Sequence, residues 1–487
     1  MQISTRRNLA WMSVSQGGLF IIQFGGSVAM ARLLKPYEMG VYAVAAAIIG
    51  VLGTIRAFGL SSLIIRKAEL DDHLTTTTFT INALLAILTS LMIFVLALAG
   101  GALLGDPGVQ HVMLLLAVTP LINMFEFLPS TCLERGGAFR VLAVIAMIKA
   151  VLSTIVTITL AVEGFSYMSI AWGNLVSASV SVVCINVVGR RHASLRVGLR
   201  DWRSVTVYGL QMLGVSALGN IAGRLSELLL GRLISISALG LYTRASGLNG
   251  LLWDNLHLVI GRVTFVDFAE QRRRSIPLRE SYLKIVAMIT GLLWPAFAGM
   301  ALLAGPVVAT VYGKDWLGAA TPLSMLSVAG LLLTTITMTF EIFVICGETN
   351  RQLRLEARRT LVGLGLFGLG CLSGLVWAAA SKIGEAIYMI LLYKQDLKRM
   401  TETSAGDYRS IYRQSAGLTI IACAPTAVVM AANGWSPDTS LISIFGAIAV
   451  GAAGWVAMLW KLHHPLFGEG EAIARRLFRI TVRSSAG

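Results

Sequence analysis

Residues 230–245 read LGRLISISALGLYTRA, and their central part repeats a pattern that stands 200 residues earlier in the chain. Residues 232–242, RLISISALGLY, match residues 32–42, RLLKPYEMGVY, in the opening Arg-Leu pair and the closing Gly-x-Tyr group. Each copy ends one long apolar run and leads into the next, and about six such runs separate the copies. Copies separated by an even number of membrane crossings share an orientation, so the spacing predicts two parallel halves.

The whole chain is rich in apolar residues. Of its 487 residues, 56% are apolar and 13% are charged, and the mean hydropathy is +0.74. A soluble domain carries about 25% charged residues, because its surface must be hydrated. The composition therefore excludes a water-soluble protein.

The apolar residues gather in runs that are long enough to cross a bilayer. A spanning helix needs about 20 predominantly apolar residues, and about 14 runs come near this length. They lie near residues 8–31, 40–63, 76–100, 111–133, 141–162, 166–188, 205–231, 238–261, 282–309, 321–345, 360–377, 379–393, 414–432 and 439–460. The eleventh and twelfth are the weakest, because Lys382 and Glu385 interrupt them.

The basic residues predict how the chain is oriented. If the N-terminus is cytoplasmic, the inner segments hold about 29 Lys and Arg residues and the outer segments about four. Such a bias is the positive-inside signal, and it places both termini in the cytoplasm. It also accounts for most of the net charge of +15 without a nucleic acid partner.

The repeat and the spans together predict an all-α membrane protein of about 14 transmembrane helices, arranged as two parallel six-helix repeats plus two C-terminal helices. We expect an N-lobe at residues 1–200 and a C-lobe at residues 201–400. Two additional spans at residues 401–461 and a basic cytoplasmic tail at residues 462–487 complete the chain.

Five short motifs, in order along the chain, carry a resemblance to a known superfamily. They are Ala31-Arg32-Leu33-Leu34 with Gly40-Val41-Tyr42, Leu133-Glu134-Arg135 with Phe139-Arg140, Leu230-Gly231-Arg232 through Ala245, Tyr312-Gly313-Lys314-Asp315-Trp316, and Gly347-Glu348-Thr349-Asn350. With them the chain resembles the multidrug/oligosaccharidyl-lipid/polysaccharide exporter superfamily, and within it the Wzx-like polysaccharide flippases. Ser226 is a departure, because the family often has an acidic residue at that place, five positions before the glycine that aligns with Gly231.

The resemblance implies a transporter and not an enzyme. Such a flippase moves a polyprenyl-diphosphate-linked oligosaccharide from the inner to the outer face of the bacterial cytoplasmic membrane by alternating access, for exopolysaccharide or O-antigen biosynthesis. The partners that it implies are the lipid-linked oligosaccharide and membrane lipids, with a polysaccharide polymerase and other assembly proteins as further partners. We expect a monomer that binds no nucleic acid.

Three arginines inside the spans are the candidates for binding the anionic headgroup. Arg56 lies well inside the second span, Arg224 in the seventh, and Arg244 near the outer end of the eighth. Ionisable side chains are costly in a bilayer and usually face a cavity or a partner, and guanidinium groups match the geometry of phosphate. Structural pairing is the alternative, Arg224 with Glu227 and Arg56 with Glu126 or Asp254.

The intramembrane acids Glu227, Asp254 and Glu341 are candidates for coupling transport to H⁺ or Na⁺. No other cofactor is expected. The chain contains no G-x-x-x-x-G-K-[ST] loop for ATP, and its five cysteines lie in apolar runs without the C-x-x-C spacing of a metal site.

Two other functions fit the hydropathy. A cation-coupled multidrug exporter of the same superfamily takes substrates that are often cationic, and intramembrane arginines argue against it. A membrane-embedded glycosyltransferase or polysaccharide polymerase usually carries a large outer loop or acidic catalytic residues there, whereas the longest connections of this chain are on the inner side.

Overall fold

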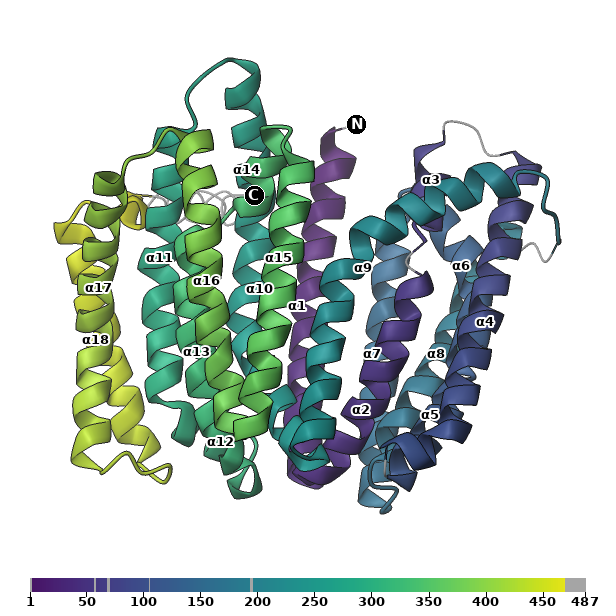
Figure 1. Cartoon of the computed structure of the whole chain (residues 1–487), viewed down its shortest axis with the longest axis horizontal. Helices are drawn as coiled ribbons and strands as arrows, with labels where there is room; N and C mark the ends of the chain where they lie inside the picture. Colours follow the sequence, from purple (N-terminus) through teal and green to yellow (C-terminus); the bar gives the residue numbers. More distant parts are fainter. Residues whose placement is uncertain (1, 57, 68–70, 105, 193–195, 469–487) are drawn as a thin grey trace, which may run out of the picture. The chain divides into compact units, whose positions relative to one another are not determined.

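The apolar runs fold as helices in a computed structural model of the chain (Figure 1). The structure describes residues 2–56, 58–67, 71–104, 106–192 and 196–468. Within these ranges the side chains of residues 2–15, 99–104, 192, 211, 212, 214–219 and 254–266 are outside the description. Every regular element in the described ranges is an α-helix or a short 3-10 helix, and the chain divides into two units, Met1–Gly240 and Leu241–Gly487.

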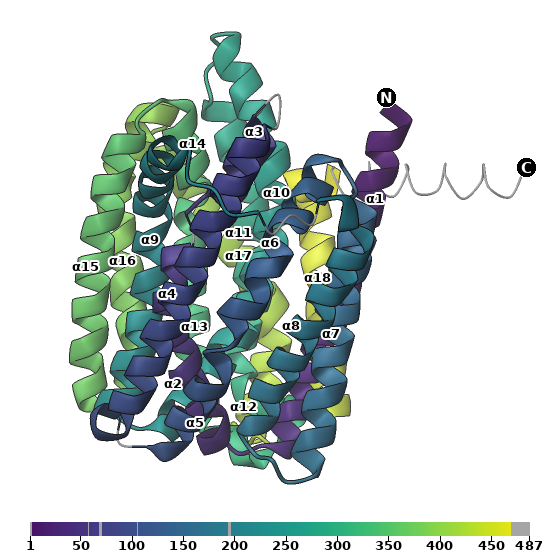
Figure 2. The same ribbon diagram turned by 90° about the vertical axis from the view of Figure 1, so that its right-hand side faces the viewer.

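The first unit contains nine α-helices and two 3-10 helices in its described part. They are α1 (Gln2–Leu33), α2 (Pro36–Gly53), η1 (Thr54–Arg56), α3 (Leu60–Arg66), α4 (Asp72–Leu104), α5 (Pro107–Leu116), α6 (Thr119–Arg135), α7 (Phe139–Val162), α8 (Met168–Val188), η2 (Arg190–His192) and α9 (Trp202–Leu233). Helices α7 and α8 lie side by side, as Figure 2 shows, and α2 packs against α9.

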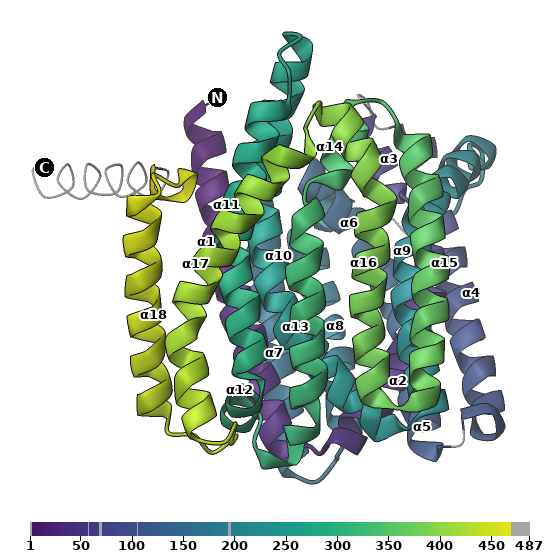
Figure 3. The same ribbon diagram turned by 60° about the vertical axis from the view of Figure 1, so that its left-hand side comes forward.

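The second unit begins inside α10 (Ile236–Arg273). Its further elements are α11 (Arg279–Leu302), α12 (Ala304–Val311), η3 (Lys314–Ala319), α13 (Ala320–Leu333), η4 (Thr334–Ile336), α14 (Thr339–Ile345), α15 (Thr349–Ser373), α16 (Leu375–Thr401), α17 (Ala405–Ala432) and α18 (Leu441–Lys461). Helices α17 and α18 lie side by side (Figure 3). One apolar core of the unit joins α10, α11, α14 and α16 around Tyr282, Phe297, Phe343 and Tyr393.

The predicted spans can be compared with these helices one by one. In the described part of the chain, 10 segments are long and apolar enough to cross a membrane, which makes the chain a multi-pass membrane protein. The other four predicted spans coincide with α1, α9, α10 and α15, so the count of about 14 stays a prediction. The eleventh and twelfth spans separate at Gly374, whose φ of 110° favours glycine, and not near residue 378.

The equivalent glycines of the repeat, Gly40 and Gly240, lie where two backbones touch. A methyl group on Gly40 would overlap the carbonyl oxygen of Ile236, and one on Gly240 would overlap the carbonyl oxygen of Pro36. Pro36 and Ile236 are themselves equivalent positions of the repeat, so the contact is reciprocal. Reciprocity of this kind is the geometry of two copies related by a two-fold axis, and small residues permit the close approach inside a membrane.

Replacing either glycine of this contact should destabilise the protein. We expect Gly40→Ala and Gly240→Ala each to cost about 1–3 kcal/mol, because a methyl group must displace a neighbouring backbone. The control is Gly223→Ala in α9, where nothing lies within 4 Å of the added carbon; it should be neutral or stabilising by roughly 0.5–1 kcal/mol. Thermal unfolding of the purified protein in detergent measures the difference, and a Gly40→Ala protein as stable as the Gly223→Ala protein would contradict the contact.

Candidate functional site

The second span is interrupted in the middle, and Arg56 stands at the interruption. Helix α2 ends at Gly53, the 3-10 turn η1 ends at Arg56, and the helix resumes as α3 at Leu60. Gly59 caps α3 with a φ of 63°, a left-handed conformation that costs glycine little. Irregular backbone at membrane depth is tolerated only where it is buried in protein or lines a cavity, and discontinuous helices often form transporter binding sites.

Helix α9 runs antiparallel to this interrupted span and contacts it on both sides of Arg56. Near the start of α9, Gly209 lies against the ring of Phe58. Further along, the Nε of Arg224 lies 2.7 Å from the place where a Cβ of Gly50 would stand. The structure therefore brings Arg56 and Arg224, two of the three predicted headgroup ligands, onto adjoining helices of one unit.

Arg56 is half-buried and lacks a full set of partners. Its Nε is buried without a hydrogen-bond partner among the described residues. Glu126 of α6 is the acid that acts on it electrostatically, but the two side chains form no ion pair. Glu126 instead accepts a hydrogen bond of 3.3 Å from the hydroxyl of Ser181 on α8. The arginine is thus held beside an acid without being neutralised by contact.

Arg224 is paired but remains accessible. Its Nη1 lies 3.0 Å from the carboxylate of Glu227, the pair that sequence reasoning offered as the structural alternative, and 45% of its side chain is exposed. Tyr42 of α2 lies within its electrostatic field and accepts a hydrogen bond of 2.6 Å from Asn174 on α8. An exposed ion pair of this kind is weak, about 0–1 kcal/mol, so an anionic ligand can compete with Glu227 for the guanidinium.

Arg244 belongs to the second unit and has different surroundings. Its guanidinium lies over two aromatic rings, 5.7 Å from the centroid of Tyr312 and 5.9 Å from that of Trp316. Both rings are buried, with 3% and 1% exposure. Cation–π contacts with desolvated rings are worth about 2 kcal/mol, so these aromatic residues hold Arg244 in a fixed orientation.

Of the predicted coupling acids, Glu341 has the most distinctive position. It lies in the first turn of α14, 8% exposed, just after the break in a second interrupted span. Helix α13 ends at Leu333, η4 ends at Ile336, and Met338 has a φ of 58°. The side chain of Asp254 lies outside the described residues.

An ion network joins α15 and α16, and the sequence did not predict it. Glu385 accepts 2.8 Å contacts from both Arg359 and Lys382, and Arg359 also bonds Glu356 through its Nε at 3.0 Å. The hydroxyl of Tyr393 donates to Glu356 at 3.1 Å. Two cations and two acids balance, which explains why the weak eleventh and twelfth spans tolerate charge. The spacings of three residues within each helix were visible in the sequence, but the link between the helices was not.

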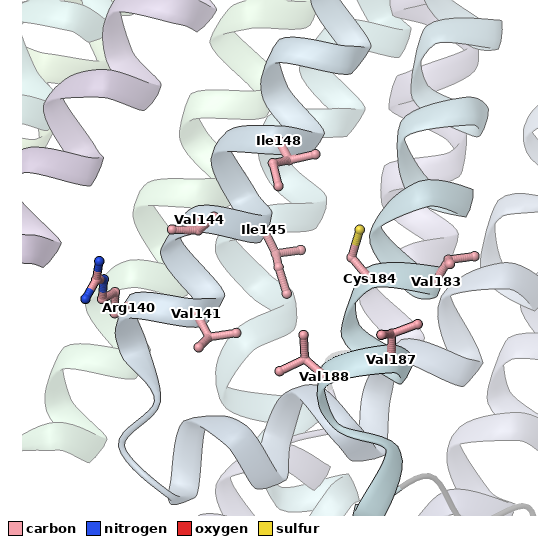
Figure 4. A pocket seen from close by; sticks show the side chains of 9 residues that line it. All are labelled: Arg140, Val141, Val144, Ile145, Ile148, Val183, Cys184, Val187 and Val188. Carbon is pink, nitrogen blue, oxygen red and sulfur yellow. The ribbon is translucent and has the colours of Figure 1, made fainter.

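A groove of about 580 Å³ lies between α7 and α8 (Figure 4). Its lining is apolar except for Arg140, whose guanidinium points away from the valine and isoleucine side chains. No set of three or more His, Cys, Asp or Glu side chains in the described part of the chain is placed to hold a metal ion.

The sequence can now be compared with known proteins. The profile of polysaccharide biosynthesis proteins matches residues 29–321. The chain belongs to the polysaccharide biosynthesis protein family. This family agrees with the resemblance that the motifs of the chain predicted.

Two curated relatives illustrate the similarity. The succinoglycan biosynthesis transport protein ExoT of Rhizobium meliloti is 24% identical over 328 residues, which are 67% of this chain and 66% of ExoT. The lipopolysaccharide biosynthesis protein WzxC of Escherichia coli is 25% identical over 323 residues, 65% of this chain and 64% of WzxC. The chain thus matches just under two thirds of the length of each relative.

Solved structures show the same fold. The lipid II flippase MurJ, in an inward closed conformation, superposes with a TM-score of 0.76 at 12% identity, covering 93% of this chain and 99% of MurJ. An inward-facing multidrug resistance MATE family transporter of the MOP superfamily superposes with a TM-score of 0.63 at 17% identity, covering 80% and 96%.

The network between α15 and α16 predicts a thermodynamic cycle. Glu385→Gln should destabilise the protein by about 3–5 kcal/mol, because Arg359 and Lys382 then face each other without their shared acid. Glu385→Gln combined with Lys382→Met should recover most of the loss, since Arg359 keeps Glu356. Thermal unfolding in detergent measures the cycle. The control is Glu402→Gln, which changes an exposed acid without a described ion pair and should be neutral; equal effects of E385Q and E402Q would refute the network.

Proposed function

We propose that this protein is a flippase that moves a polyprenyl-diphosphate-linked oligosaccharide from the inner to the outer face of the bacterial cytoplasmic membrane. The observation that carries the proposal is the pair of arginines, Arg56 and Arg224, on adjoining helices beside an interrupted span. The family and the names of the relatives support it. ExoT is named for transport in succinoglycan biosynthesis, WzxC for lipopolysaccharide biosynthesis and MurJ for flipping lipid II.

The two arginines suit a diphosphate for electrostatic and geometric reasons. A diphosphate carries negative charge and several acceptor oxygens, and each guanidinium presents a planar fork of donors that can bind two of them. Arg56 retains a buried donor without a described partner. In this proposal the phosphate oxygens accept from Arg56 and compete with Glu227 for Arg224, and Arg244 stays a further candidate for binding the headgroup.

The acids give the proposal a driving force. Glu227 loses its partner when the headgroup takes Arg224, and a carboxylate without a cation binds H⁺ or Na⁺ more readily. Glu341, just after the break in the tenth span, is the matching candidate in the second unit, and Asp254 stays a third. Two halves, at residues 1–200 and 201–400, would alternate in exposing the site to the two sides while the polyprenyl chain stays in lipid.

The function itself is tested by locating the substrate. In cells without this gene, the lipid-linked oligosaccharide should accumulate on the inner face and surface polysaccharide should fall. The purified full-length protein in liposomes should move the oligosaccharide extracted from those cells to the other leaflet, where an impermeant lectin detects it. Elongation of the glycan by the purified protein would instead indicate a polymerase, and accumulation of no lipid-linked glycan would overturn the flippase.

Substitution of the two arginines should slow this transport without unfolding the protein. Arg56→Gln and Arg224→Gln should each lower the initial rate about 10- to 100-fold, the effect of losing a hydrogen bond to a charged group. Arg56→Lys should recover only part of the rate, because lysine keeps the charge but not the fork. The control is Arg190→Gln in η2, an exposed basic residue away from the interrupted span, which should transport normally. Full transport by a folded Arg56→Gln protein would remove Arg56 from the site.

A further inference from the structure

The second unit contains a groove of about 610 Å³ at the end of the helix pair α16 and α17. Figure 3 shows the end at which the chain turns from one helix into the other. The floor of the groove is apolar and aromatic, formed by Ile336, Ile390, Leu397, Tyr408 and Tyr412. The excess of basic residues on inner segments assigns this end to the cytoplasmic side, so the groove is at the depth of the inner-leaflet headgroups.

Four basic side chains line the same groove. Lys394 and Lys398 are one turn apart on α16, and Arg409 and Arg413 are one turn apart on α17. None of them forms an ion pair or a side-chain hydrogen bond with a residue in the described part of the chain. Four cations around one groove repel one another, and an anion placed among them relieves that repulsion.

Three acids of this region are already engaged by other arginines. Asp396 pairs with Arg351 at 2.7 Å, and Asp407 pairs with Arg279 at 2.8 Å. Glu348 pairs with Arg399 at 2.6 Å, and its hydrogen bond with that guanidinium holds the pKa of the carboxyl below its ordinary value. The four groove cations form no described ion pair with these acids or with Glu402, the exposed acid that follows α16.

We propose that this groove binds an anionic phospholipid of the inner leaflet. The headgroup phosphate accepts hydrogen bonds from Lys394, Lys398, Arg409 and Arg413, and the upper acyl chains cover the apolar floor. Two observations favour a lipid over a soluble anion: apolar and aromatic side chains line the same groove as the cations, and the groove lies at the ends of two membrane spans. Charge-assisted hydrogen bonds to phosphate from both lysine and arginine are strong, and basic clusters at this depth attract anionic lipids.

The lipid would also rest on side chains that support the interrupted tenth span. Tyr412, in the floor, donates a hydrogen bond of 2.8 Å to the carbonyl oxygen of Thr335 in η4. Trp294 stacks on Tyr412 with ring centroids 5.7 Å apart and donates to the hydroxyl of Thr334 at 2.8 Å. A bound lipid therefore stabilises the aromatic support of a backbone that has lost its helical hydrogen bonds.

The test measures lipid binding to the purified full-length protein in detergent. Phosphatidylglycerol should raise the unfolding temperature and should remain bound in native mass spectrometry, whereas phosphatidylcholine should do neither. Lys394→Gln combined with Arg413→Gln should weaken phosphatidylglycerol binding about 25-fold, at about fivefold for each charge removed near the membrane surface. The second pair, Lys398→Gln with Arg409→Gln, should act in the same way.

The matched control is Arg190→Gln combined with Arg191→Gln, which removes two exposed cations outside the groove and should bind phosphatidylglycerol like the parent protein. Equal binding by the groove variants and this control would overturn the proposal. Equal stabilisation by inorganic phosphate would mean a soluble-anion site, and preferential retention of undecaprenyl diphosphate over phosphatidylglycerol would mean a substrate site; either result would also overturn it.

Discussion

The reciprocal contact of Gly40 with Ile236 and of Gly240 with Pro36 is the constraint on which the first unit depends. It fixes the start of α2 against the start of α10 at backbone distance, which only residues without a side chain allow. Helix α9, which precedes α10 by a short turn, is thereby set antiparallel to α2, and Gly231 of α9 closes the same end against Val44. The register that places Arg224 beside Gly50 follows from this one close approach.

The interrupted spans are the second constraint, and the two units hold the interrupted segment in place by different kinds of contact. In the first unit the segment after η1 is anchored by Phe58, which packs on Gly209 and joins a small apolar cluster with Leu60 and Val205. In the second unit the segment around η4 is held by polar contacts, from Trp294 to Thr334 and from Tyr412 to Thr335. In the first unit the apolar anchor offers no hydrogen-bond acceptor, so the adjacent arginine keeps a donor without a described partner. In the second unit the polar anchors form hydrogen bonds with the interrupted segment themselves.

The sequence predicted what depends on local composition. Runs of about 20 apolar residues are a local signal, and the 10 described spans coincide with predicted runs. The orientation that the asymmetry of Lys and Arg predicts stays a prediction. The sequence did not predict the break at residues 54–59, because Thr54, Ile55 and Arg56 carry no strong helix-breaking signal, and Gly59 alone is common in membrane helices. Nor did it predict that Arg359 reaches Glu385, since partners 26 residues apart on two helices share no sequence period.

The distribution of partners separates the structural cations from those available to a ligand. Each of five cations contacts an acid: Arg359, Lys382, Arg351, Arg399 and Arg279. Arg244 lies over two aromatic rings. Removing one partner of a buried pair is costly, and the most buried acids among these pairs are Glu385 and Asp396, whose side chains are 13% and 4% exposed. Arg56 feels Glu126 only through space, and Arg224 holds Glu227 in an exposed pair that costs little to open. A substrate anion can displace such a weak partner when it binds, and the partner can displace the anion when it is released. A fully neutralised arginine would prevent binding, and a wholly unpaired arginine would make binding irreversible.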